Sequence, residues 1–235
     1  MTSISRQLDQ NHKDTSLPVH PNPMDRNRSI LWARYHIDSD DWLVLATKVT
    51  LDPEQEGFAL VSMALIDGAG RTVFEALVKP DREVPNDLIA MHALDYAVVF
   101  NAQPYPVLRQ KLIEHMSEKE VTAWNFDEQR NVLNALDKTF GLPAYEWLGN
   151  SVSHQLARFT GVKTDNSEGY ELQPLTINGL AARDQCLAVR KSVVDMASSS
   201  QAVDSLSGGK PGWTAQFYRP KISPADKLKN LFGRR

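Results

Sequence analysis

The chain has 235 residues, enough for one domain of ordinary size with additional tails. Apolar residues make up 42% and charged residues 23%, which is close to the average of soluble globular proteins and excludes a chain that is disordered throughout. No segment approaches the about 20 consecutive apolar residues of a membrane span, and residues 1–30 lack the apolar run of a signal peptide, so a cytoplasmic protein without membrane contact is expected. Cys186 is the only cysteine, which excludes an internal disulfide and a zinc site built from several thiolates.

Charge is distributed unevenly along the chain. Residues 31–197 carry 15 basic and 24 acidic residues, a net charge of -9, whereas residues 198–235 carry seven basic and two acidic residues, a net charge of +5. A nucleic-acid-binding surface needs a local excess of cations. The tail has this excess, and the central body lacks it on average, although ordinary solvation explains both charge excesses equally well.

The pattern of the front half predicts strands and hairpins. Residues 1–29 are polar, contain three prolines and show no hydrophobic period, which predicts a disordered arm. Apolar and β-branched residues then predict strands, with a tight connection at Asp67–Gly70 between the last two. The expected strands are 30–35, 42–46, 58–66 and 72–78.

The later half has mainly helical periodicity. Apolar residues at helical spacing predict helices over 85–91, 104–116, 128–140, 152–160 and 180–197, with a short buried strand over 121–124. Strands in the front half, followed by helices that alternate with single strands, indicate an α/β domain over 30–197. We therefore expect a mixed five-stranded sheet flanked by helices.

The segment after this domain divides into two parts. Residues 198–212 have the composition of a linker, and residues 213–235 form a basic, aromatic tail. Ser223 and Pro224 predict the N-cap and first position of a short helix that places Leu228, Leu231 and Phe232 on one face. This helix is expected either to dock on a protein partner or to fold back on its own domain.

Four segments in a fixed order resemble motifs of one enzyme family. They are FALVSMALIDGAGRTVFEALVKPDREVP (58–85), HALDYAVVFNAQPYPVLRQKL (92–112), AWNFDEQRNVL (123–133) and AARDQCLAVRKSVVDMA (181–197). Together with residues 43–51, they are similar to the DnaQ-like 3′-to-5′ exonucleases, the DEDDh group of the ribonuclease H-like fold. The resemblance implies a ribonuclease H-like sheet, a phosphodiester substrate, two divalent metals held by four carboxylates, and a histidine that activates water.

The positions that match the first motif have lost its acidic residues. The resemblance places an Asp and a Glu, separated by one residue on a strand, at Ala46 and Lys48. Side chains two residues apart on a strand leave the same face, where they would hold the metals together. Lys48 adds a positive charge at a place intended for cations, which disfavours metal binding further.

The other motifs retain little of the expected chemistry. A gapless match puts Gln129 at the third carboxylate, while a slip of two residues would put Asp127 there instead. Asp184 matches the fourth carboxylate, and the histidine position falls on Gly179. A substitute base is conceivable among His92, His115 and His154. We also expect Lys48 to contact Asp184 across the vacated metal site.

The resemblance and these losses together imply a catalytically degenerate exonuclease-like protein, without cofactor, that binds nucleic acid or a protein partner. The residues expected to contact single-stranded DNA or RNA are Lys48, Asn125, Lys210, Arg219 and Lys221. One alternative is an active exonuclease that uses Mg²⁺ or Mn²⁺ with unorthodox ligands. Another is a scaffold whose partner docks on residues 213–235. The resemblance also makes a homodimer an expectation.

Overall fold

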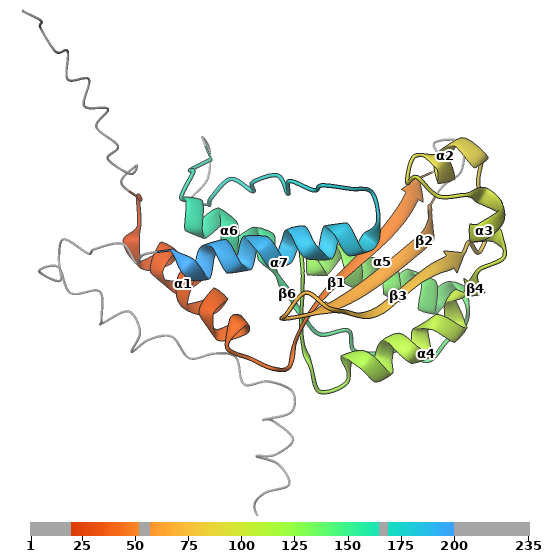
Figure 1. Cartoon of the computed structure of the whole chain (residues 1–235), viewed down its shortest axis with the longest axis horizontal. Helices are drawn as coiled ribbons and strands as arrows, with labels where there is room; N and C mark the ends of the chain where they lie inside the picture. Colours follow the sequence, from red (N-terminus) through yellow and green to blue (C-terminus); the bar gives the residue numbers. More distant parts are fainter. Residues whose placement is uncertain (1–19, 52–56, 165–168, 200–235) are drawn as a thin grey trace, which may run out of the picture.

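The computed structural model describes residues 20–51, 57–164 and 169–199. A six-stranded sheet in the order β4-β3-β2-β1-β5-β6 forms its centre (Figure 1). The long strands β1 (Trp42–Leu51), β2 (Phe58–Asp67) and β3 (Thr72–Lys79) are antiparallel, whereas β5 (Glu120–Ala123) runs parallel to β1. The predicted α/β class with a mixed sheet is confirmed. The expected number of strands was wrong, because β4 (Gln103–Pro104) and β6 (Asn150–Ser151) were not predicted and one of the five expected strands, over 30–35, is helical.

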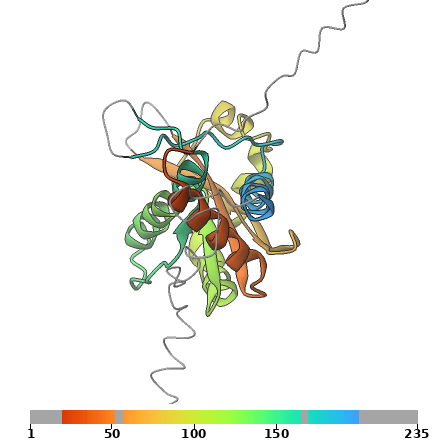
Figure 2. The ribbon, with the colours of Figure 1, turned by 90° about the vertical axis from the view of Figure 1, so that its left-hand side faces the viewer.

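Helices cover both faces of the sheet (Figure 2). On one face, α4 (Tyr105–Met116) and α5 (Phe126–Thr139) bury their apolar sides against Leu43 and Leu45 of β1. On the other, α7 (Ala182–Ser198) covers Val44 and Ala46, and α6 (Val152–Thr160) packs against α7. The short helices α2 (Asn86–Ala90) and α3 (Tyr96–Phe100) close a third cluster at Ala59 and Val61. No helix in the described ranges is long and apolar enough to cross a membrane.

The first described helix corrects the strand expected over 30–35. This segment belongs to α1 (Pro23–Ile37), which starts within the predicted arm. Its N-cap is Asn22, whose side chain accepts a hydrogen bond from the Met24 amide at 3.1 Å. The helix packs against both α6 and α7 and buries residues on several sides, so its apolar residues do not repeat at one helical spacing. The remaining helix and strand boundaries differ from the predicted ones by a few residues, and α3 was not predicted.

A buried ion pair joins α4 to α5 beneath the sheet. The Arg109 guanidinium donates to the two Asp137 carboxylate oxygens at 2.6 and 3.1 Å. Tyr105 donates its hydroxyl hydrogen to the same carboxylate at 2.8 Å, and the Trp147 indole donates to it at 3.3 Å. Arg109 also donates to the Pro143 carbonyl at 2.7 Å. Both charged side chains are buried, and this carboxylate raises the pKa of Arg109.

Candidate functional site

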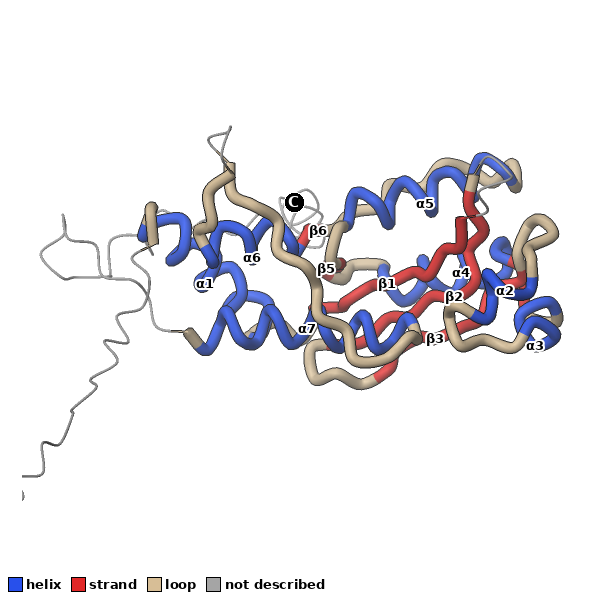
Figure 3. Tube along the Cα trace, turned by 90° about the horizontal axis from the view of Figure 1, so that it is seen from above, coloured by secondary structure: helices blue, strands red, loops and turns tan. Residues whose placement is uncertain are grey.

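The five positions singled out by the family resemblance meet around β1, which runs between α5 and α7 when the molecule is seen from above (Figure 3). We call Ala46, Lys48, Gln129, Gly179 and Asp184 the β1 site. Ala46 and Lys48 lie on the strand face that α7 covers, because Ala46 packs in the cluster of α7 and alternate residues share a face. Ala46 is buried and Lys48 is half-buried.

Gln129 ties α5 to the free edge of β1. Strand β5 pairs with β1 only from Trp42 to Val44, so the β1 edge beyond this point has no strand partner on that side among the described residues. The Gln129 carboxamide oxygen accepts hydrogen bonds there from the Thr47 amide at 2.9 Å and the Thr47 hydroxyl at 2.6 Å. Gln129 is buried, whereas Asp127 lies exposed and pairs with Arg130 at 2.6 Å. The structure therefore places Gln129, and not Asp127, against β1.

Asp184 serves the start of α7. Its Oδ2 accepts a hydrogen bond from the Ala181 amide at 3.1 Å, which satisfies one of the donors at this helix N-terminus. Gly179 lies in the turn just before α7 and has a φ of +119°. A Cβ at this position would lie 2.1 Å from Asp184 Oδ2. A histidine at this position would meet both backbone strain and a steric clash. The observed corner thus requires glycine where the resemblance implies a base.

The predicted direct contact between Lys48 and Asp184 is not formed: no salt bridge joins them within the described part of the chain, and Asp184 caps α7 instead. The two charges still influence each other. Burial lowers the pKa of Lys48, and the negative charge of Asp184 opposes this shift. Burial and the Lys48 charge together lower the pKa of His92. Burial first, and then the Glu75 charge, raise the pKa of the Cys186 thiol beneath the site.

A cavity of about 300 Å³ adjoins the β1 site at the start of α7, and we call it the α7 cavity. Ser62, the cross-strand neighbour of Lys48, lies in its wall. The full lining comprises Ser62, Met63, Glu75, Ala76, Leu77, His92, Leu94, Leu180, Ala181 and Ala182. The cavity combines an apolar wall with two ionisable side chains, a typical composition for a small-ligand pocket.

The three histidines proposed as substitute bases lie in different places. His92 lines the α7 cavity. His115 packs its ring against Phe74, with ring centroids 5.8 Å apart, and His154 is exposed on α6. Sequence reasoning did not distinguish His92 from the others, because only the turn after α2 brings it near Lys48. Glu75 in the same cavity was not predicted as a site residue, although it is a charged residue within the strand predicted over 72–78.

The remaining predicted nucleic-acid contacts divide into two groups. Asn125 is the N-cap of α5, and its side chain accepts a hydrogen bond from the Glu128 amide at 3.4 Å. Lys210, Arg219 and Lys221 lie outside the described residues, as do the predicted linker from residue 200 onward and the aromatic tail.

The residues at the β1 site do not fit a centre of two divalent metals. Such a centre needs several oxygen ligands to neutralise two ions about 4 Å apart. Three of the five positions hold Ala46, Lys48 and Gly179, and the Gln129 oxygen already accepts two hydrogen bonds from Thr47. Across the ranges that the structure describes, no three His, Cys, Asp or Glu side chains gather to hold one ion.

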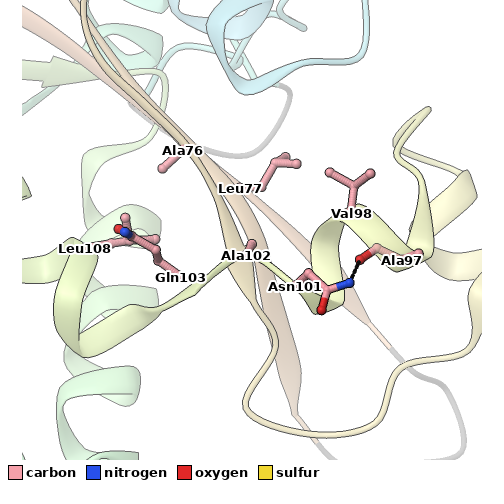
Figure 4. A pocket seen from close by; sticks show the side chains of 8 residues that line it. All are labelled: Ala76, Leu77, Ala97, Val98, Asn101, Ala102, Gln103 and Leu108. Atoms are coloured by element: carbon pink, nitrogen blue, oxygen red, sulfur yellow. Dashed lines mark hydrogen bonds between the residues drawn. The ribbon is translucent and has the colours of Figure 1, made fainter.

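A second and larger cavity, of about 620 Å³, lies at the edge of the sheet beside β3 and α3 (Figure 4). Its lining is mostly apolar and contains no charged side chain. The residues are Ala76, Leu77, Ala97, Val98, Asn101, Ala102, Gln103 and Leu108, and we call this cavity the β3 groove.

No family model matches the chain, and no curated protein matches it. Solved structures of nucleases do match in fold. One is a 3′-exonuclease whose structure shows 3′-end specific recognition of a histone mRNA stem-loop. It is 15% identical, with a TM-score of 0.49 over 68% of this chain and 81% of that chain. Exonuclease X in complex with 5′ overhanging duplex DNA is 17% identical, with a TM-score of 0.37 over 68% of this chain and 95% of that chain. Cell-death related nuclease 4 is 12% identical, with a TM-score of 0.39 over 67% of this chain and 63% of that chain.

The similarity to these nucleases concerns the arrangement of the mixed sheet and its helices. The α/β class and the mixed sheet expected from the sequence are confirmed by the structure itself.

Proposed function

We propose that the protein binds a single nucleic-acid strand at the β1 site and does not cleave it by a metal-dependent reaction. The exonuclease-like fold points to a function related to nucleic acids. The observation that carries the proposal is the position of Lys48, a half-buried cation on the face of β1 where the family motif requires carboxylates. A fixed ammonium attracts a phosphodiester directly, whereas a metal centre would need ligands that these positions lack.

The surroundings of Lys48 favour a phosphate as its counterion. Within the described residues Lys48 has no salt bridge, and Asp184 uses one carboxylate oxygen to cap α7. A phosphate placed against Lys48 would compensate a charge that is already partly removed from water. The adjoining α7 cavity offers the apolar side chains of Leu94 and Leu180 to a nucleobase. Lys210, Arg219 and Lys221 would then add contacts to phosphates farther along the strand.

Replacing Lys48 by alanine is expected to weaken the binding of single-stranded oligonucleotides of every sequence alike, because a phosphate contact carries no base information. The slope of log affinity against log salt should fall in magnitude by about one. Fluorescence anisotropy of labelled DNA and RNA strands over a series of salt concentrations measures both quantities.

Lys138→Ala provides the matched control, because Lys138 lies exposed in the last turn of α5, away from the face of β1 that carries Lys48. This variant should retain the affinity and most of the salt slope of the unmodified protein. Equal affinities and slopes for Lys48→Ala and Lys138→Ala would contradict the assignment of Lys48 as a phosphate contact.

A further inference from the structure

The outer edge of β3 is largely unpaired. Within the described residues, β3 pairs on this side only through Val78 and Lys79, which meet the two-residue strand β4. The edge from Thr72 to Leu77 therefore has no strand beside it, and the β3 groove opens next to Ala76 and Leu77 (Figure 4). An unpaired strand edge exposes backbone donors and acceptors that accept a further strand.

The chemistry of the β3 groove fits an extended segment with apolar side chains. Val98 in its wall is 55% exposed, and Val107 on neighbouring α4 is 47% exposed. An exposed strand edge beside an uncharged apolar groove is the geometry of strand addition, in which the backbone pairs with the edge and alternate side chains enter pockets. The occupant must therefore have apolar residues at every second position.

We propose that residues 213–218 of the same chain, with the sequence Trp-Thr-Ala-Gln-Phe-Tyr, add to the edge of β3 and fill the β3 groove. Trp213, Ala215 and Phe217 fall on one face of an extended strand, since side chains alternate with a period of two. Aromatic residues and threonine also favour strands. This inference does not depend on whether the β1 site binds nucleic acid.

The intervening chain is long enough for this contact. Fourteen residue steps separate Ser199, where the described part ends, from Trp213, and they span up to about 46–50 Å when extended. From Ser199, at the C-terminal end of α7, the linker would have to run back along the helix, which is about 25 Å long. Its first residue, Ala182, lines the α7 cavity together with Ala76 and Leu77, which also line the β3 groove. The extended linker is therefore longer than the helix along which it has to run, so residue 213 can reach the β3 groove.

Charge favours the chain's own tail over a second copy of the domain. Residues 198–235 carry a net charge of +5 and residues 31–197 a net charge of -9, so tail and body attract each other while two bodies repel. Glu75 lies exposed on the β3 edge itself, and Arg219 directly follows the proposed strand.

Hydrogen exchange on the full-length protein tests this contact. In Trp213→Ala/Phe217→Ala, the backbone amides of residues 73–77 should exchange at least about tenfold faster than in the unmodified protein, because two aromatic side chains leave the groove. The matched control is Leu231→Ala/Phe232→Ala, which removes two apolar side chains elsewhere in the tail and should leave the exchange of residues 73–77 unchanged. Equal exchange in all three proteins, or equal acceleration in both variants, would overturn the proposal.

Disulfide trapping in the full chain identifies the copy that supplies the strand. Cys186 is the only cysteine of the sequence and is fully buried, so the two engineered cysteines would be the thiols available for trapping. Gln103→Cys/Ala215→Cys should form a disulfide within one chain. Leu148→Cys/Ala215→Cys is the control, because Leu148 lies next to β6 at the opposite edge of the sheet. Trapping between two chains, or equal trapping in the control pair, would overturn docking within one chain.

Discussion

Asp137→Ala is expected to lower the free energy of unfolding by about 3–5 kcal/mol, because it leaves the buried Arg109 guanidinium without its counterion. The same substitution removes the acceptor of the Tyr105 hydroxyl and of the Trp147 indole. Three donors, two from α4 and one from the segment after α5, thus lose one shared acceptor in the layer that holds α4 and α5 together. Urea unfolding followed by circular dichroism measures the change.

The control for this loss is an ion pair at the surface. Lys119 and Asp41 form a salt bridge, and the Asp41 side chain is 60% exposed. Because exposed pairs contribute little, Asp41→Ala should cost less than about 1 kcal/mol. Similar small losses for Asp137→Ala and Asp41→Ala would show that the buried network does not stabilise the fold in the way described.

Gln129→Ala is expected to lower the free energy of unfolding by about 2–4 kcal/mol, since the Thr47 amide and hydroxyl would both lose their buried acceptor and a cavity would open. Gln129→Met keeps nearly the same volume but lacks the acceptor, so it should retain the hydrogen-bond part of this loss. Chemical unfolding of the two variants separates the effects.

Gln110→Ala serves as the comparison for Gln129, because Gln110 is exposed on α4 and bonds only to Glu114 among the described residues. Its substitution should change the free energy of unfolding by no more than about 0.5 kcal/mol. If Gln129→Ala and Gln129→Met were as stable as Gln110→Ala, Gln129 would not be the structural tie between α5 and β1.

The elements predicted best from sequence are those with one buried face. The apolar stripe of α5, with Leu133 and Leu136 in the core, gives a clear helical period, and the helix was placed within two residues of its observed start. In α1 this signal is absent, because the helix packs against both α6 and α7 and its buried residues, such as Asn27, Ile30 and His36, include polar ones and do not share one face. The Asn22-Pro23 sequence was the available start signal, since it supplies an N-cap and a first helical residue.

The short strands depended on tertiary contacts. Strands β4 and β6 contain two residues each and exist only because β3 and β5 lie beside them in parallel. A pair of residues carries no periodicity, so no local pattern predicts such strands. Contacts between side chains of the β1 site, such as Lys48 and Asp184, also depend on tertiary structure and have no local sequence pattern.

The candidate site was predicted by position more than by contact. The motif spacing singled out Ala46, Lys48 and Gln129, and the structure brings all three to one strand, because spacing within strands and helices determines which residues share a face. Their role in a functional site stays a prediction. The contact between Lys48 and Asp184 was predicted wrongly, since charge alone did not reveal that the α7 corner needs the Asp184 carboxylate. Helix capping competes with ion pairing for the same oxygen.

The most direct test of binding without metal-dependent cleavage is to incubate the full-length protein with 5′-labelled single strands in Mn²⁺ or Mg²⁺ and to resolve the products at one-nucleotide intervals. We predict that the strands stay intact under conditions in which anisotropy shows them bound. A metal-dependent ladder of shortened strands that disappears in Asp184→Asn would contradict this account, because asparagine can still accept the Ala181 hydrogen bond but cannot supply a carboxylate to a metal.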